Sequence, residues 1–141
     1  MAEVLADFLV ATPSGYYCRY GDFYIDPLLP VENAVISHAH GDHARPGHQH
    51  IYATAGTAEF MKHRFPRQAP GSYNTVPFGD YFWINGIEFR FIPAGHILGS
   101  AQIWMRYAGC TYLYTGDIKL QADPTCEAFQ TVQARNRPLP R

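Results

Sequence analysis

The sequence has 141 residues and a formal net charge of −1, and 16% of its residues are charged against a usual fraction of about 25%. Apolar residues make up 47%, which excludes a wholly disordered chain, and the charge excludes an overall positive field that attracts nucleic acid. No apolar segment approaches the ~18 residues of a membrane span, so we expect no membrane contact.

The three cysteines, Cys18, Cys110 and Cys126, lack the spacing of a disulfide framework or of a CxxC metal site. We expect them to be buried small apolar residues. The N-terminus carries Glu3 and Asp7 but no Lys or Arg, unlike a secretory signal. These features predict a reducing compartment, with the cytoplasm as the default location.

Short β-prone segments and turn signals dominate the chain, as 12 Gly, 11 Pro and 15% aromatic residues indicate. A turn is predicted at Gly21-Asp22, and a helix is predicted over 55–64 with Thr54 as its N-cap. Strands of the first half are expected at 16–20, 23–25, 34–37 and 51–53.

Two hairpins are predicted in the second half. Asn85-Gly86 is a strong type I′ turn signal, and Ala108-Gly109 marks the second turn. The polar segment 134–141 is predicted to be a disordered tail. The hairpin strands are expected at 81–84, 87–92, 101–107 and 110–114.

A histidine-rich string follows the third predicted strand. His38 and His40 lie two positions apart, so in an extended segment their side chains point to the same side and can bind one metal ion. Asp42 and His43 are neighbours that point away from this pair, which suits a second ion, and Gly41 allows a sharp turn between the pairs. The alternative is a solvated loop with chance histidines, which the constrained order HxHxDH disfavours.

Further residues are candidates for the same site. His96 lies in a Gly-flanked loop, and Asp117 follows a strand and a glycine, where its two carboxylate oxygens can bridge two cations. Imidazole with carboxylate suits zinc, with manganese or iron as alternatives. Asp26 either orients a metal-bound histidine through a hydrogen bond or ends a strand in a turn. The remaining histidines are expected to be surface or loop residues: His48, His50 and His63.

These motifs resemble the metallo-β-lactamase superfamily, because HxHxDH at 38–43, His96 and Asp117 match its motifs in order. Longer strings look like its β-CASP nuclease branch, and within it the ligase-associated DNA exonucleases, relatives of the mRNA 3′-end processing nucleases. The resemblance extends from about Thr12 to about Gln133. The strings that carry it are TPSGYYCRYGDFYIDP, VISHAHGDHARPG, PAGHILGSAQ and YTGDIKLQADPTC.

The resemblance implies an α+β fold, an αββα sandwich with a dinuclear zinc centre at the edges of its sheets. Residues 1–133 would form the N-terminal part of this domain. By motif, one zinc would be held by His38, His40 and His96, the second by Asp42 and His43, with Asp117 as the bridge. The resemblance makes Asp42 and His43 the catalytic residues of phosphodiester cleavage, and Asp42 would also handle the proton of the attacking water.

The later family motifs, which complete the second zinc site, are not found in this sequence. Two hypotheses follow. In the first, the chain carries the centre of a nuclease of DNA, or of RNA, with a functional link to a DNA ligase and to DNA repair; a thioester or lactam hydrolase is the enzymatic alternative. In the second, it is a non-catalytic piece that associates with itself or another chain through exposed strand edges.

Overall fold

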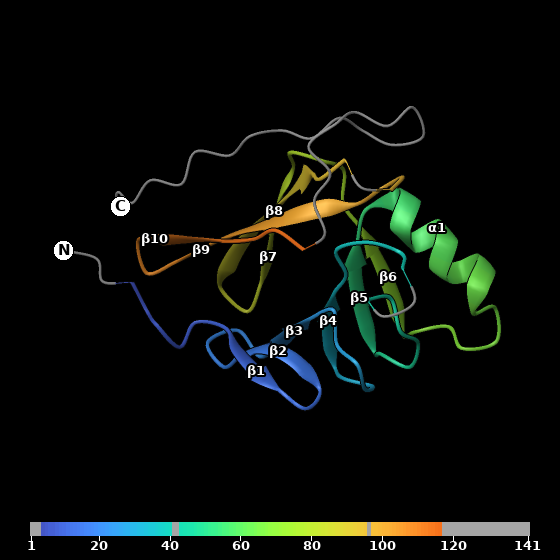
Figure 1. Ribbon diagram of the computed structural model, residues 1–141, viewed down its shortest axis with the longest axis horizontal. Coiled ribbons are helices and arrows are strands. Elements are labelled where there is room, and N and C mark those ends of the chain that lie inside the picture. The colour runs from blue at the N-terminus through green and yellow to red at the C-terminus, as the bar shows by residue number, and fades with distance from the viewer. Residues whose placement is uncertain (1–3, 41–42, 96, 117–141) are drawn as a thin grey trace.

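The computed structural model describes residues 4–40, 43–95 and 97–116, which form two β-sheets and a helix (Figure 1). One sheet contains β1 (Val10–Thr12), β2 (Gly15–Cys18), β3 (Phe23–Ile25), β4 (Asn33–Val35), β5 (His50–Ala53) and β6 (Ser72–Thr75), in that order. The other contains β7 (Tyr81–Ile84), β8 (Ile87–Pro93), β9 (Ala101–Tyr107) and β10 (Cys110–Tyr114), in the order β10-β9-β8-β7. The helix is α1 (Ala55–Arg64). The predicted α+β class is confirmed.

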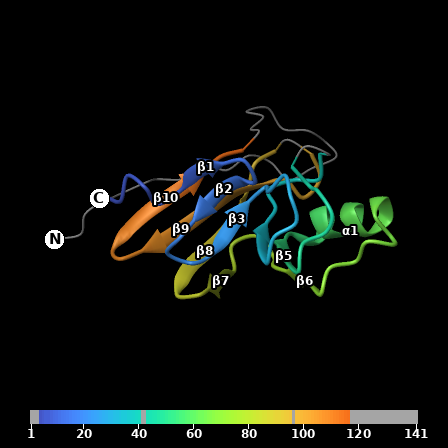
Figure 2. The same ribbon diagram turned by 90° about the horizontal axis from the view of Figure 1, so that it is seen from below.

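The six-stranded sheet lies between α1 and the four-stranded sheet (Figures 1 and 2). Successive side chains of its parallel strands β4 and β5 point alternately toward α1 and toward the four-stranded sheet. Ala34 and Ile51 pack in the cluster that includes Met61 of α1, whereas Val35 and Tyr52 belong to the cluster shared with the other sheet. A strand that is covered on both faces carries apolar side chains on both of them. These layers correspond to one helix layer and both sheets of an αββα sandwich.

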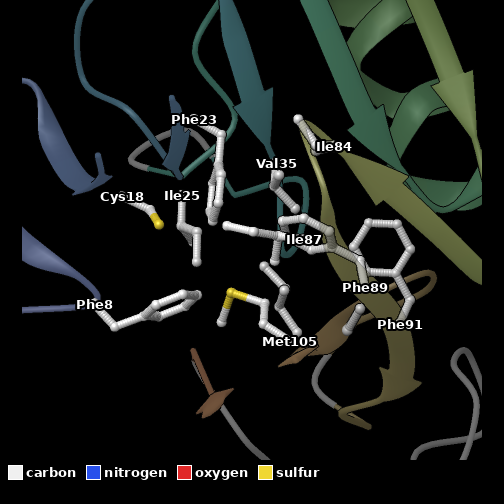
Figure 3. Close-up of a cluster of buried hydrophobic side chains, with 12 residues drawn as sticks. Phe8, Cys18, Phe23, Ile25, Val35, Ile84, Ile87, Phe89, Phe91 and Met105 are labelled. Carbon is white, nitrogen blue, oxygen red and sulfur yellow. The ribbon is translucent and has the colours of Figure 1, made fainter. Parts of the chain in front are cut away.

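Aromatic side chains fill the core between the sheets (Figure 3). Phe23 of β3 meets Phe89 of β8 edge to face, with ring centroids 4.9 Å apart. Phe8, which precedes β1, stacks on Tyr112 of β10 with centroids 3.9 Å apart. Such pairs contribute about 0.5–1.5 kcal/mol beyond the burial of their area. The N-terminal segment is therefore anchored to the strand that ends the described chain.

Most predicted turns are confirmed. Asn85 and Gly86 have φ of 47° and 85°, and Ala108 and Gly109 have 51° and 81°, so both hairpins have the two positive φ values of a type I′ turn. The helix has the predicted bounds, and the Thr54 side chain accepts the N–H of Thr57. No helix among the described residues is long and apolar enough to cross a membrane.

Two strands were not predicted, and two predicted strands, at 16–20 and 34–37, end earlier than expected. β1 and β6 were not predicted, and β2 ends at Cys18 instead of continuing to residue 20. The chain leaves the ladder there because Arg19 and Tyr20 turn to Asp7: Arg19 Nη2 lies 2.9 Å from its Oδ2 and the Tyr20 hydroxyl 2.8 Å from its Oδ1. Cys18 and Cys110 are buried, as predicted. Cys126 and the segment 134–141 lie outside the described residues.

Candidate metal centre

His38 and His40 lie where the two sheets meet. The preceding residue, Ser37, accepts the backbone N–H of Ala101, the first residue of β9, at 2.8 Å. This bond joins the end of the β4 segment to the other sheet. The strand predicted at 34–37 ends at Val35 in the structure, because the backbone of Ser37 bonds to Ala101 instead of continuing the pairing of β4 with its neighbours in the sheet. The histidines are therefore fixed relative to both sheets.

A tight turn brings His43 back against His38. The backbone N–H groups of His43 and Ala44 both donate to the His40 carbonyl, at 2.9 and 2.8 Å. The ring centroids of His38 and His43 are 4.2 Å apart, and those of His38 and His40 are 5.1 Å apart. The expectation that His43 points away from the pair was wrong, because this turn reverses the chain. The three imidazoles form one cluster.

Asp26 is the buried carboxylate of this cluster, and its backbone is left-handed, with φ of 47°. Its Oδ1 accepts the Ser37 N–H at 2.8 Å, and its Oδ2 accepts the Ser37 hydroxyl at 2.7 Å. Oδ2 also lies 2.8 Å from His43 Nδ1 and accepts the Tyr114 hydroxyl at 3.2 Å. Three of these four contacts are made by Oδ2 and one by Oδ1. Asp26 is thus arranged to orient its neighbours.

The same contacts determine which nitrogen of each histidine carries the proton. A carboxylate without a proton can only accept hydrogen bonds, so toward that form of Asp26 the Nδ1 of His43 would be the donor. The Ser37 hydroxyl gives its single hydrogen to Asp26, so the Nδ1 of His38 donates to the Ser37 oxygen across 2.9 Å. With the Nδ1 of each ring engaged in this way, the neutral form of either imidazole would present Nε2 as the atom with a lone pair, which is one of the two atoms through which histidine binds metals.

The donor set fits a metal ion. One candidate ligand atom from each of Asp26, His38 and His43 lies within 4.8 Å of the others. Imidazole nitrogen and carboxylate oxygen suit zinc and other transition metals. Asp26 is one of these three candidate ligands, and its role in orienting the histidines stays a prediction. The arrangement supports a metal cofactor.

Comparison with known proteins places this site in context. No protein-family model matches the chain. A protein named "Probable DNA ligase" from Opitutus terrae is 34% identical over 124 residues, covering 85% of this chain and 12% of that protein. An RNase J-like protein of Methanocaldococcus jannaschii is 35% identical over 107 residues, and the match covers 62% of this chain and 25% of that protein. Endoribonuclease YSH1 of Saccharomyces cerevisiae is 39% identical over 49 residues, 35% of this chain and 6% of that protein.

The resemblance to the β-CASP nucleases of the metallo-β-lactamase superfamily is confirmed. A crystal structure of a protein from Parabacteroides distasonis, named "Putative metal-dependent hydrolase", superposes with a TM-score of 0.53 and 16% identity. The match covers 73% of this chain and 56% of that protein, and it shows the shared fold. The chain spans a quarter or less of the length of the curated relatives named above.

The structure describes only some of the ligands that the β-CASP resemblance implies. His38 and His43 lie together, and His40 is exposed beside them. Ligation by these residues stays a prediction. The remaining implied ligands lie outside the described residues: Asp42, His96 and Asp117.

Two residues that position the histidines were missed by sequence reasoning, Ser37 and Tyr114. Ser37 had a signal, since a hydroxyl directly before His38 is within reach of its ring. Tyr114 had none, because 88 positions separate it from Asp26 in the sequence.

The other histidines differ from one another. His63 is exposed on α1, and His50 begins β5 with its Nδ1 2.8 Å from the Ser72 hydroxyl. His48 was expected in a loop or at the surface; it lies in a loop but is only 1% exposed. Its Nδ1 accepts the Val31 N–H at 3.2 Å, and its Nε2 has no hydrogen-bond partner among the described residues. Burial lowers the pKa of His48 below its ordinary value.

This burial predicts a loss of stability in mild acid. Because the pKa of His48 is lowered in the folded protein, protons bind it more readily in the unfolded chain. Its contribution is complete above about pH 6.5, the pKa of an unfolded histidine, and is lost as the pH falls below that value, by at most about 1.4 kcal/mol per pH unit. Urea unfolding in EDTA at pH 8 and pH 5.5 should show a smaller acid loss for His48→Asn than for the original chain. Equal losses would contradict the prediction.

Proposed function

We propose that the chain carries the metal centre of a nuclease that hydrolyses phosphodiester bonds. The observation that carries the proposal is the Asp26 carboxylate, which orients His43 directly and His38 through Ser37 so that both present Nε2. Relatives named as a ribonuclease, an endoribonuclease and a DNA ligase support a nucleic-acid substrate. The ligase relative matches 85% of this chain, which favours DNA over RNA and supports a functional link to a ligase in DNA repair.

The residues have distinct roles in this proposal. One zinc would be held by His38, His40 and His96, and a second by Asp42 and His43, with Asp117 between them. Zinc bound there would polarise the phosphodiester and make a water molecule acidic near neutral pH. Asp42 and His43 are the proposed catalytic residues, and Asp42 receives the proton of the attacking water. Asp26 and Ser37 keep the imidazoles from rotating, which limits the ways in which the ions can be placed.

The test is metal-dependent hydrolysis by the purified chain. Metal-free protein is supplied with Zn²⁺ or Mn²⁺ and assayed on bis(4-nitrophenyl) phosphate, labelled single-stranded DNA and RNA, a chromogenic β-lactam and a thioester. We expect cleavage of the phosphodiesters only, and its reduction to background in the double variant His38→Ala/His40→Ala. Native mass spectrometry of the same samples counts the bound ions.

A matched control is His50→Gln, since His50 is a partly exposed histidine of the same sheet. This variant should retain full activity. Hydrolysis that persists in the double variant would refute the proposal, as would cleavage of the lactam or thioester in preference to phosphodiesters. Metal binding without any phosphodiester cleavage would also refute it and would favour a non-catalytic piece that acts with another chain.

A further inference from the structure

A groove extends from the histidine loop along α1. Its part beside the metal centre has a volume of about 590 Å³ and is lined by His40, Phe60, Arg64 and Leu98, among others. A second hollow of about 420 Å³ shares Phe60 and Leu98 with it and reaches Glu59. Both volumes lie within the range of about 300–1,000 Å³ that is typical of small-molecule sites. The groove is therefore large enough for a nucleotide and continuous with the candidate centre.

Two large apolar side chains form the walls of the groove. Phe60 of α1 is 48% exposed and Leu98 of the loop before β9 is 44% exposed. The Leu98 wall is rigidly placed, because the next residue, Gly99, accepts the hydroxyl groups of Thr54 and Thr57 at 2.6 and 3.2 Å. Both apolar side chains are thus accessible in the groove to a flat apolar ligand.

The end of the groove nearest the metal centre is positively charged. Lys62, His63 and Arg64 occupy the last turn of α1, where cations also offset the helix dipole. Glu59 lies 3.3 Å from Lys62 and compensates its charge. Arg64 donates instead to the uncharged carbonyl of Ala39, at 3.0 Å, which holds its guanidinium at the groove beside the histidine loop. Its charge can therefore attract an anion at that end.

We propose that this groove binds one nucleotide of a single strand, next to the phosphodiester that reaches the metal centre. The base lies against Phe60 and Leu98, and the phosphate lies toward Arg64 and His63. The inference rests on the proposed nuclease function and specifies its substrate as single-stranded nucleic acid. A paired base within a duplex is stacked on its neighbours and cannot offer its face to Phe60, whereas an unpaired base can. Stacking is tolerant of base identity, so DNA and RNA strands both qualify.

A second aromatic surface supplies the matched control. Tyr81, Trp83 and Trp104 lie on the four-stranded sheet. The Arg90 guanidinium already lies 5.3 Å from the Tyr81 ring and 5.1 Å from the Trp104 ring, so two of these rings hold a cation of the chain itself. Trp83, 61% exposed, is more accessible than Phe60 and does not line the groove. Trp83→Ala therefore removes an exposed aromatic ring without touching the proposed site.

The experiment measures binding without metal. Fluorescein-labelled ten-nucleotide oligo(dT), oligo(U) and a ten-base-pair duplex are titrated with the chain in EDTA at low salt, and anisotropy is recorded. Stacking on an aromatic ring contributes about 1–3 kcal/mol per base, so Phe60→Ala should raise the Kd for both single strands by about 5- to 150-fold. Phe60→Trp should restore binding, Trp83→Ala should change the Kd less than twofold, and the duplex should bind more weakly than either strand.

Equal effects of Phe60→Ala and Trp83→Ala would overturn the inference, as would duplex binding as tight as that of the single strands. Absence of oligonucleotide binding by the original chain would also overturn it and would indicate that another polypeptide covers the groove. Hydrolysis of bis(4-nitrophenyl) phosphate by the original chain is measured separately. Its absence together with Phe60-dependent binding refutes the proposed function and keeps the groove assignment, and the opposite result refutes only the groove.

Discussion

Replacing Asp26 with asparagine is expected to weaken zinc binding by about 10- to 100-fold, the usual effect of losing a group that orients a metal ligand. Among the described residues, the hydrogen-bond contacts of the carboxylate are with Ser37, His43 and Tyr114. An asparagine would turn its amide N–H groups toward at least one of them. Hydrogen bonds to a charged group contribute about 1.5–3 kcal/mol, so we also expect the free energy of unfolding to fall by about 3 kcal/mol.

The control for this variant is Asp22→Asn. Asp22 has the same left-handed backbone as Asp26, with φ of 50° against 47°, but its side chain is exposed. Asparagine adopts this conformation readily, so backbone strain cancels between the two variants. Zinc affinity is measured by competition with a chromophoric chelator, and stability by urea unfolding in EDTA. Equal behaviour of the two variants would refute the assigned role of Asp26.

Gly99→Ala is expected to destabilise the chain by about 2–4 kcal/mol, the sum of left-handed backbone strain and overpacking. Gly99 has φ of +82°, and an added Cβ would lie 2.7 Å from the Thr57 nitrogen and 3.0 Å from the Gly56 Cα. Both are backbone atoms of α1 and cannot move independently of the helix. The loop before β9 would have to shift away from α1, which would also break the bond from the Thr54 hydroxyl to the Gly99 carbonyl.

The variant Gly79→Ala separates the effect of left-handed backbone strain from the effect of steric overlap with α1. Gly79 has φ of +85°, yet no atom lies within 4 Å of the position of an added Cβ. The free energy of unfolding of this variant should fall only by the cost of backbone strain, about 1–2 kcal/mol. Urea unfolding of both variants in EDTA measures the difference. A loss for Gly79→Ala as large as that for Gly99→Ala would show that the contact with α1 does not matter.

The parts of the fold predicted from the sequence are those with a local chemical signal. Thr54 can cap a helix and Asn85-Gly86 can form only a few turns, so the helix and the hairpin followed directly. β1 and β6 have no such signal, since they are three and four residues long and β6 is polar. β6 is a strand because its backbone pairs in parallel with β5, and this pairing depends on the rest of the sheet.

In the candidate site, too, the features with a local signal in the sequence were predicted and the others were not. His38, His40 and His43 lie within one short string, so a metal centre was predictable from spacing alone. The return of His43 toward His38 depends on a turn at the His40 carbonyl, which the spacing did not indicate. The burial of His48 depends on the Val31 segment, which packs there only in the folded chain.

The distance in sequence between Asp26 and Tyr114 has a consequence for how the chain is made. A ribosome adds about 5–20 residues per second, so the 88 positions between them take about 4–18 s to synthesise. During this interval the histidines have emerged but the set of donors around the Asp26 carboxylate is incomplete. The hydrogen bond from Tyr114 to Asp26 can therefore complete the surroundings of this carboxylate only after β10 has been made.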